Sequence, residues 1–169
     1  MTELPKTAVV LGCGFVAVEL ATILNGMGVR TTMLGRSTIL KGFLDDEMRA
    51  TLLNNMQKSG LDVKLNSPWK RVLQTEEGQL QVELNSGEVL ECDTVFPMTQ
   101  FPSTTDGMGL ENTGIKLTES NDIYTNDYLE TSVTGVYAVG NVNGNVVRPQ
   151  WLSERARSLP RGSSMARHS

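Results

Sequence analysis

Hydrophobic residues near the start of the chain form first a continuous run and then a helical pattern. Residues 8–11 are apolar without interruption and the run stops at Gly12, which is typical of a short buried strand. Beyond residue 15, apolar side chains recur at helical spacing, and we expect them to form the buried stripe of a helix: Val16, Leu20, Ile23, Leu24 and Met27. A second strand is expected at 29–34, a second helix at 45–59 and a third strand at 61–65.

After residue 68 the hydrophobic period changes from helical to alternating. The strand-like pieces are residues 70–75, 79–84 and 89–92. They are separated by Glu-Glu-Gly and Asn-Ser-Gly, which are both favourable hairpin turns. This pattern predicts a β-meander where a helical crossover would be usual. Two further short strands are expected, one at 94–98, weakened by Pro97, and one at 133–140.

The turn after the first strand reads G-x-G-x-x-A, with Gly12, Gly14 and Ala17 as its small residues. Gly12 permits a tight turn, Gly14 leaves room for a pyrophosphate, and Ala17 lets helix and strand pack closely. The helix that follows presents its N–H groups and its dipole to the phosphates. Such a motif also arises in accidental strand–turn–helix units, but here it lies in the context that the nucleotide-binding fingerprint requires. The sequence therefore predicts an α/β fold with a Rossmann-like parallel sheet and a β-meander crossover.

Composition fits a soluble globular protein and narrows the chemistry. Of the 169 residues, 39% are hydrophobic and 20% are charged, with a net charge of −4. No run approaches the ~18 apolar residues of a membrane span, and no signal-peptide pattern is present, so we expect a cytoplasmic protein without a membrane partner. Cys13 and Cys92 lack metal-ligand spacing, and the single histidine, His168, is next to the end. We therefore expect no metal site and no Ser/His/Asp or Cys/His catalytic set.

The second strand ends without the acidic residue that binds the ribose hydroxyls of NAD. No Asp or Glu lies between Glu19 and Asp45. Arg36 and Ser37 occupy this place, and Lys41 follows shortly after. A guanidinium, a hydroxyl and an ammonium suit a dianionic 2′-phosphate, so the sequence favours NADP(H) over NAD(H). A solvated basic loop is the alternative interpretation.

Two stretches carry a resemblance to a known family. Residues 4–43, which hold the glycine turn and the basic loop, resemble the pyridine-nucleotide domain of the FAD-dependent disulfide reductases, such as glutathione, thioredoxin, mercuric and dihydrolipoamide reductases. Residues 109–144, ending in VTGVYAVGNVNG, resemble the segment of the same family that leads back into its FAD domain. The basic pattern is most similar to the branch of glutathione and thioredoxin reductases that uses NADPH.

The resemblance implies a set of cofactor-binding residues: Gly12, Gly14, Phe15, Val16, Ala17, Glu19, Arg36, Ser37, Lys41, Gly140 and Asn141. The glycine turn would hold the pyrophosphate of a nicotinamide nucleotide, and the basic loop would hold the 2′-phosphate. Phe15 stands where the family has a gate over the nicotinamide pocket. Glu19 matches a glutamate that pairs with a lysine near the flavin, although a solvated helix position is the alternative. Gly140 and Asn141 stand where the family has a Gly-Asp pair beside the flavin.

The chain also departs from the family pattern. Thr99-Gln100 replaces the usual Gly-Arg, and Asn141 replaces an aspartate. The FAD-binding G-x-G-x-x-G, the redox cysteine pair and the C-terminal interface domain are not found. We therefore expect the NADPH-binding domain of a disulfide reductase, as a fragment or truncated product, with FAD binding only in a complete enzyme. A catalytically silent binding module and an independent reductase are the alternatives.

The sequence suggests three segments. Residues 1–120 are expected to form the NAD(P)-binding domain, 121–147 the return towards an FAD domain, and 148–169 a disordered basic tail with five arginines. Residues 136–139 would then be a strand without its partner, prone to self-association by edge pairing. The tail lacks interleaved aromatic residues, so we expect no nucleic-acid partner.

Overall fold

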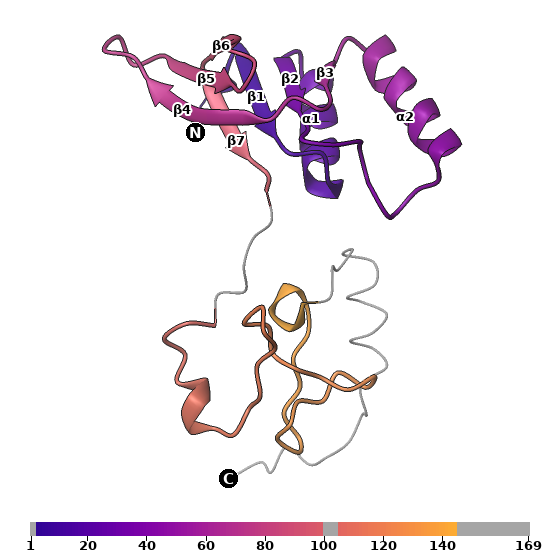
Figure 1. Ribbon diagram of the computed structural model, residues 1–169, viewed down its shortest axis with the longest axis vertical. Helices are drawn as coiled ribbons and strands as arrows, with labels where there is room; N and C mark the ends of the chain where they lie inside the picture. Colours follow the sequence, from indigo (N-terminus) through magenta and orange to yellow (C-terminus); the bar gives the residue numbers. More distant parts are fainter. Residues whose placement is uncertain (1–2, 100–104, 145–169) are drawn as a thin grey trace. The chain divides into compact units, whose positions relative to one another are not determined.

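The computed structural model describes residues 3–99 and 105–144 (Figure 1). The chain divides into two compact units, Met1–Gln100 and Phe101–Ser169. The first unit holds all the strands and both longer helices of the described chain. Among the described residues, none of the helices has the length and apolar character needed to cross a membrane.

The first unit is built on a parallel sheet in the order β3-β2-β1-β7. Its strands are β1 (Thr7–Leu11), β2 (Arg30–Leu34), β3 (Asp62–Lys64) and β7 (Thr94–Pro97). β1 and β2 run in register from the pair Thr7 and Arg30 to the pair Leu11 and Leu34. The two strands therefore end side by side, and the turns that follow them start at the same edge of the sheet. The predicted α/β fold and its four parallel strands are confirmed.

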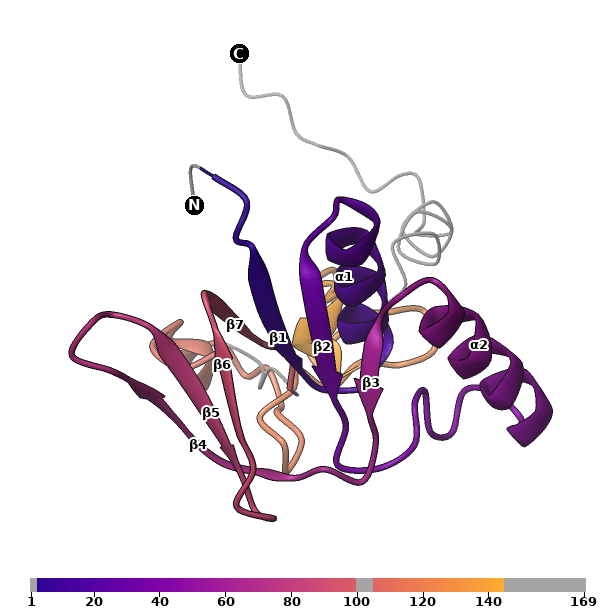
Figure 2. The same cartoon turned by 90° about the horizontal axis from the view of Figure 1, so that it is seen from above.

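Helix α1 (Phe15–Gly26) connects β1 to β2 and packs against both strands (Figure 2). Its buried residues are Ala17, Ala21 and Leu24. The predicted stripe is wrong in part, because Val16, Ile23 and Met27 are 56%, 58% and 56% exposed. Small alanine side chains let the helix axis approach the sheet closely, so they occupy the sheet-facing side in place of the larger residues.

Helix α2 (Asp46–Lys58) confirms the second predicted helix. The Asp45 carboxylate accepts a hydrogen bond of 2.8 Å from the Met48 N–H and so caps the helix start. Met56 is buried on its inner side, and Leu52 and Leu53 are partly buried against the same core. Figure 2 shows α2 beyond the β3 side of the sheet.

The predicted β-meander is also confirmed. It consists of β4 (Trp69–Gln74), β5 (Leu80–Leu84) and β6 (Val89–Cys92), paired antiparallel in this order. The side chains of β1 alternate between two cores. Ala8 and Val10 join the core beneath α1, whereas Val9 and Leu11 join a second core with the meander residues Val82, Leu84 and Cys92. The parallel sheet thus lies between a helical layer and the meander.

A reciprocal set of hydrogen bonds joins the start of β1 to the connection between β6 and β7. The Asp93 carboxylate accepts the N–H groups of Lys6 and Thr7 at 2.9 and 2.8 Å. The Asp93 N–H in turn donates to the Thr7 hydroxyl at 2.9 Å. Together these bonds lower the pKa of the Asp93 carboxyl below its ordinary value, and the bond from the Thr7 N–H has the largest effect.

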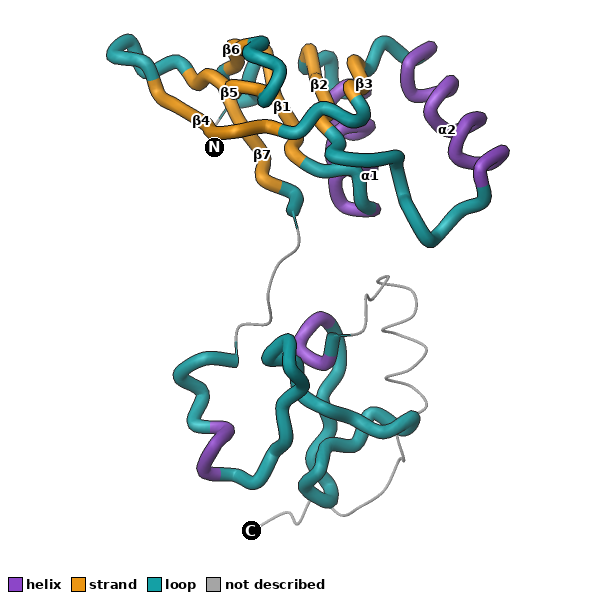
Figure 3. The backbone as a smooth tube through the Cα atoms, in the orientation of Figure 1, coloured by secondary structure: helices purple, strands orange, loops and turns teal. Residues whose placement is uncertain are grey.

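Within residues 105–144, which are the described part of the second unit, the chain forms mostly loops and turns (Figure 3). The regular elements of this part are the short helices η1 (Leu110–Asn112) and η2 (Asn141–Asn143) and two isolated bridges, one of which pairs Glu130 with Tyr137. The prediction of a strand at 133–140 is therefore wrong, because residues 133–140 form only this single β-bridge. The Ala138 N–H donates to the Leu129 carbonyl at 3.0 Å, so the backbone here already has partners within the unit.

This finding removes the argument for self-association, which depended on an unpaired strand. The predicted tail at 148–169 lies outside the described residues. The segment boundaries at residues 120 and 147 stay predictions.

Candidate functional site

The turn after β1 has a backbone that only glycine fits. Gly12 has a φ of 138°, and a Cβ placed there would lie 2.3 Å from the Met98 carbonyl oxygen. The Gly12 N–H donates to the Leu34 carbonyl at 2.8 Å and continues the pairing of β1 with β2. The chain can therefore leave the sheet edge at this point only with a residue that lacks a side chain.

Gly14 is the N-cap of α1 and leaves the start of the helix open. Its backbone is extended, it carries no capping side chain, and a Cβ placed there would meet no atom within 4 Å. The first bond back to this residue comes from the Val18 N–H, which donates to the Gly14 carbonyl at 3.0 Å. The N–H groups at the start of an α-helix point along its axis, and the helix dipole places a partial positive charge there. Bare backbone, open space and a helix dipole together suit a phosphate group.

Gly35 directly follows β2 and is hydrogen-bonded both to the end of β3 and to the connection between β3 and β4. Its N–H donates to the Lys64 carbonyl at 2.9 Å, and its own carbonyl accepts the Ser67 N–H at 2.9 Å. A Cβ here would lie 3.0 Å from the Cys13 Cβ and from the Leu65 Cδ2. The position where the chain enters the basic loop is therefore fixed tightly.

Arg36, the next residue, is exposed and stacks on an aromatic side chain. Its guanidinium carbon lies 4.8 Å from the centre of the Trp69 ring, within the range of a cation–π contact. Across residues 3–99 and 105–144, no carboxylate forms an ion pair with Arg36 or with Lys41. The charge of the loop is thus available to an anionic ligand.

The loop from 36 to 44 returns to the glycine turn. The Leu40 N–H donates to the Cys13 carbonyl at 2.9 Å, and Ile39 and Leu40 are 0% and 5% exposed. Phe43 then contacts Phe15 edge to face, with ring centres 4.6 Å apart and planes at 72°. The structure therefore brings the basic loop beside the first turn of α1.

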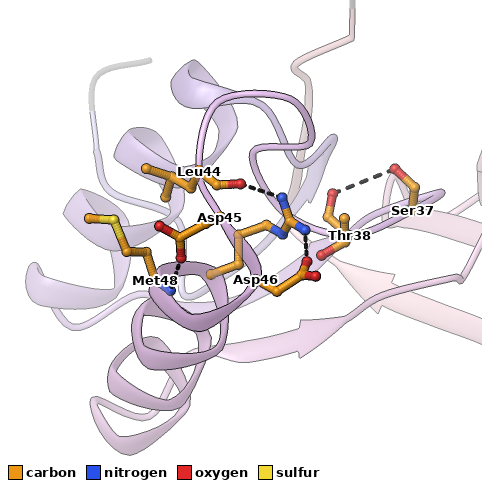
Figure 4. A network of polar contacts seen from close by, with 7 residues as sticks. Ser37, Thr38, Leu44, Asp45, Asp46 and Met48 are labelled. Carbon is orange, nitrogen blue, oxygen red and sulfur yellow. Dashed lines mark hydrogen bonds and ion pairs between the residues drawn. The ribbon is translucent and has the colours of Figure 1, made fainter.

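Figure 4 shows the middle and end of this loop from close by. Ser37 is half-buried, and its hydroxyl lies 3.5 Å from the Thr38 carbonyl oxygen, at the long limit for a hydrogen bond. Beyond it the Arg49 guanidinium contacts both the Leu44 carbonyl and the Asp46 carboxylate. This contact closes the loop onto the start of α2 and neutralises one of its carboxylates.

The remaining predicted residues are found in two places. Val16 and Glu19 are exposed on α1, and Glu19 lies one turn after Phe15. Gly140 and Asn141 lie in the second unit, where Gly140 has a φ of 99° and precedes η2. The structure therefore gathers the first-unit residues around the start of α1 and leaves these two in the other unit.

Three residues of the site were missed by the sequence analysis: Gly35, Phe43 and Trp69. Gly35 could have been found, because a glycine directly after a strand and before an arginine indicates a tight exit. No local sequence pattern indicates Trp69 or Phe43, because each contacts a residue far away in the sequence. Trp69 lies 33 positions from Arg36, and Phe43 lies 28 positions from Phe15.

The chain is similar to proteins of one known family. Residues 1–165 match the profile of the family described as pyridine nucleotide-disulphide oxidoreductase. A glutathione reductase of Burkholderia cepacia is 36% identical over 143 residues, which cover 84% of this chain and 31% of the relative. A soluble pyridine nucleotide transhydrogenase of Chromohalobacter salexigens is 30% identical over 164 residues, covering 97% of this chain and 34% of the relative.

Among solved structures, the HOCl-induced flavoprotein disulfide reductase RclA of Escherichia coli has a similar fold. The TM-score is 0.81 at 24% identity, over 93% of this chain and 36% of that protein. The chain thus spans about a third of the length of the proteins that it matches.

Proposed function

We propose a function on one premise: this chain belongs to the pyridine nucleotide-disulphide oxidoreductase family. The family is one of flavoenzymes that use nicotinamide nucleotides, and the chain carries an oxidoreductase domain of this kind. We propose more narrowly that residues 3–99 bind NADPH. In a complete enzyme of the glutathione reductase type, the domain would present the nicotinamide to FAD, from which electrons pass to a redox disulfide.

One observation carries this proposal: the hydrogen bond from the Leu40 N–H to the Cys13 carbonyl. It holds a loop with an arginine, a serine and a lysine against the turn that offers bare backbone for phosphate. In NADPH the pyrophosphate and the 2′-phosphate are both attached to the adenosine ribose, the first at its 5′ position and the second at its 2′ position. Two anion-binding features side by side on the edge of one sheet therefore suit NADPH better than NADH.

The residues have separate proposed roles. Gly12 and Gly14 leave the space in which the pyrophosphate approaches the start of α1, and Ala17 keeps the helix close to the sheet. Arg36, Ser37 and Lys41 bind the 2′-phosphate through two positive charges and a hydroxyl. An Asp or Glu in this loop would repel that group, and the sequence has none between Glu19 and Asp45.

The nicotinamide half is assigned to the other side of the turn. Bound NADPH supplies a hydride, and the protein supplies its position. Phe15 would cover the ring, and its contact with Phe43 at 4.6 Å limits the orientations open to it. Glu19 lies one turn further along α1 and would face the flavin of a complete enzyme. Gly140 and Asn141, in the second unit, would contact that flavin, with an amide in place of the usual carboxylate.

Titration of the full chain with NADPH tests the proposal. We expect saturable binding of NADPH, followed by calorimetry, with NADH at least about tenfold weaker, a difference of ~1.4 kcal/mol. Free 2′,5′-ADP should compete with NADPH, whereas 5′-AMP should compete poorly, because only the former carries the 2′-phosphate. Equal affinities for the two nucleotides would refute the NADPH assignment. Absence of binding to either would favour a silent module, and tight binding of FAD would favour an independent reductase.

A further inference from the structure

We propose that Trp69 is a positioning residue for the 2′-phosphate of NADPH, acting through Arg36. The inference rests on the proposed function, because it concerns the same nucleotide site. It goes beyond that function by assigning a specificity role to the meander, which the glycine motif and the basic loop do not include.

Trp69 is held in place by contacts that do not involve the loop. It is half-buried and packs against the core formed by the meander and the parallel sheet. Its neighbour Pro68 accepts the Asn85 N–H at 2.9 Å, which fixes the start of β4 against β5. The register of β4 with β5 shifts between Trp69 and Arg71, and a shift of this kind turns a side chain away from its regular direction.

The backbone brings the indole and the guanidinium together. The Ser67 N–H donates to the Gly35 carbonyl at 2.9 Å, so the residue before Arg36 is bonded to the residue two before Trp69. Gly35 is closely surrounded, since a Cβ there would lie 3.0 Å from the side chains of Cys13 and Leu65. The backbone thus places Arg36 beside the start of β4, and from there its guanidinium stacks on the indole at 4.8 Å.

This stack leaves the N–H donors of the Arg36 guanidinium accessible to a ligand. The indole covers one face, whereas the N–H donors lie along the edges of the guanidinium plane, where a phosphate binds in a bidentate manner. An arginine already held in one orientation loses less side-chain entropy when the ligand binds. The 2′-phosphate thus meets a guanidinium that is oriented before binding.

Two carboxylates of the meander, those of Glu83 and Glu88, already have cationic partners other than Arg36. Glu83 pairs with Arg71 at 2.6 Å and with Lys70 at 3.2 Å. Glu88 pairs with Lys64 at 2.7 Å. Both carboxylates are thus engaged by cations other than Arg36, and among the described residues Arg36 forms no ion pair beside its aromatic contact.

The test compares Trp69→Ala with Trp69→Phe in the full chain, with affinities for NADPH and NADH measured by calorimetry. A cation–π contact of ordinary strength predicts a loss of NADPH affinity of about 2- to 30-fold in Trp69→Ala. NADH affinity should stay within about twofold, because that ligand lacks the 2′-phosphate. Trp69→Phe keeps an aromatic face and should recover most of the lost affinity. Leu73→Ala, which truncates an exposed apolar side chain of the same strand, should leave the affinities for NADPH and NADH unchanged.

A double-mutant comparison separates positioning from packing. In an Arg36→Ala background, Trp69→Ala should have no further effect on NADPH affinity, because the guanidinium that Trp69 positions is absent. Equal losses for NADPH and NADH, or additive losses in the double mutant, would overturn the inference and make Trp69 a packing residue only.

Two further measurements cover the other outcomes. The Arg36 side-chain NMR signals should carry a ring-current shift in the unmodified chain that Trp69→Ala removes, and its absence would overturn the stack itself. If the unmodified chain binds NADPH no better than NADH, the proposed function fails and the inference fails with it. If it prefers NADPH and Trp69→Ala keeps that preference, only the inference fails.

Discussion

The backbone N–H of Leu40 donates to the carbonyl of Cys13 over 2.9 Å. This contact joins a loop and a turn that each follow a strand of the parallel sheet. Because β1 and β2 end in register, the two connections leave the same edge, and this bond links them next to the contact between Phe15 and Phe43. The neighbourhood of the basic side chains and the glycine turn is thus a property of the backbone.

Arg36→Ala should weaken NADPH binding and spare NADH. Losing one charge-assisted contact to phosphate costs about 1.5–3 kcal/mol, which is about 10- to 150-fold in affinity. Calorimetric titration with both nucleotides measures the effect. Arg30→Ala is the matched control, since Arg30 is exposed at the other end of the same strand and should leave both affinities unchanged. Equal losses for the two nucleotides in Arg36→Ala would contradict the assignment.

Gly12→Ala should destabilise the fold. The added methyl would lie 2.3 Å from a backbone carbonyl oxygen, and the backbone has a φ of 138° that alanine avoids. We expect a loss of at least about 2 kcal/mol in the free energy of unfolding, measured by urea titration. Gly26→Ala, at the end of α1 with open space around its Cβ position, should be neutral or slightly stabilising. A Gly12→Ala protein as stable as the unmodified chain would show that the turn can relax.

Gly14→Ala should separate binding from stability. The methyl meets nothing within 4 Å in the protein, so the unfolding free energy should fall by less than about 1 kcal/mol, the usual difference between glycine and alanine at an N-cap. The same methyl would occupy the space assigned to the pyrophosphate. Affinity for NADPH and NADH should fall together, by about tenfold or more. Unchanged affinity for both nucleotides would show that the pyrophosphate does not bind at this turn.

Asp93 should make stability depend on pH on the acid side. Hydrogen bonds from Thr7 and Lys6 lower the pKa of its carboxyl in the folded state, so the folded state binds this proton less readily than the unfolded chain does. Its stabilising contribution is therefore complete above about pH 4, the ordinary aspartate value, and is lost as the pH falls through the lower folded value.

Urea unfolding at pH 7 and in steps below pH 4 measures this dependence. Asp93→Asn should unfold at a lower urea concentration at pH 7 and show a shallower decline in acid than the unmodified chain. Glu77→Gln, in the exposed turn of the first hairpin, should behave like the unmodified chain. An acid decline of the same steepness in Asp93→Asn would assign the effect to other carboxylates.

The sequence predicted the sheet and the meander well because both depend on local patterns. Apolar runs at β1 and β2, and turn residues between alternating pieces, determine where strands begin and end. The buried side of α1 was predicted wrongly in part: Leu24 is buried as expected, but hydrophobicity also favoured Val16 and Ile23, whereas close packing on the sheet selects Ala17 and Ala21.

The remaining differences come from contacts distant in sequence. The strand predicted at 133–140 has the right residue types, but a strand also needs a neighbour, and only one pair forms there. The stack of Arg36 on Trp69 depends on the register of β4 with β5 and on the bond from Ser67 to Gly35, neither of which a single segment specifies. Candidate residues of the glycine turn and basic loop were identifiable from the sequence, whereas Trp69 and Phe43, which contact them, were not.

The alternation of β1 between two cores has a consequence for how the first unit unfolds. Val9 and Val10 are adjacent, yet one belongs to the core shared with the meander and the other to the core beneath α1. Met33 and Leu34 of β2 divide in the same way. Neither outer layer can separate from these strands without exposing one face of both, so the two layers are expected to melt as a single cooperative unit. Amide hydrogens in the middle of β1 would then exchange with solvent only when the whole unit opens.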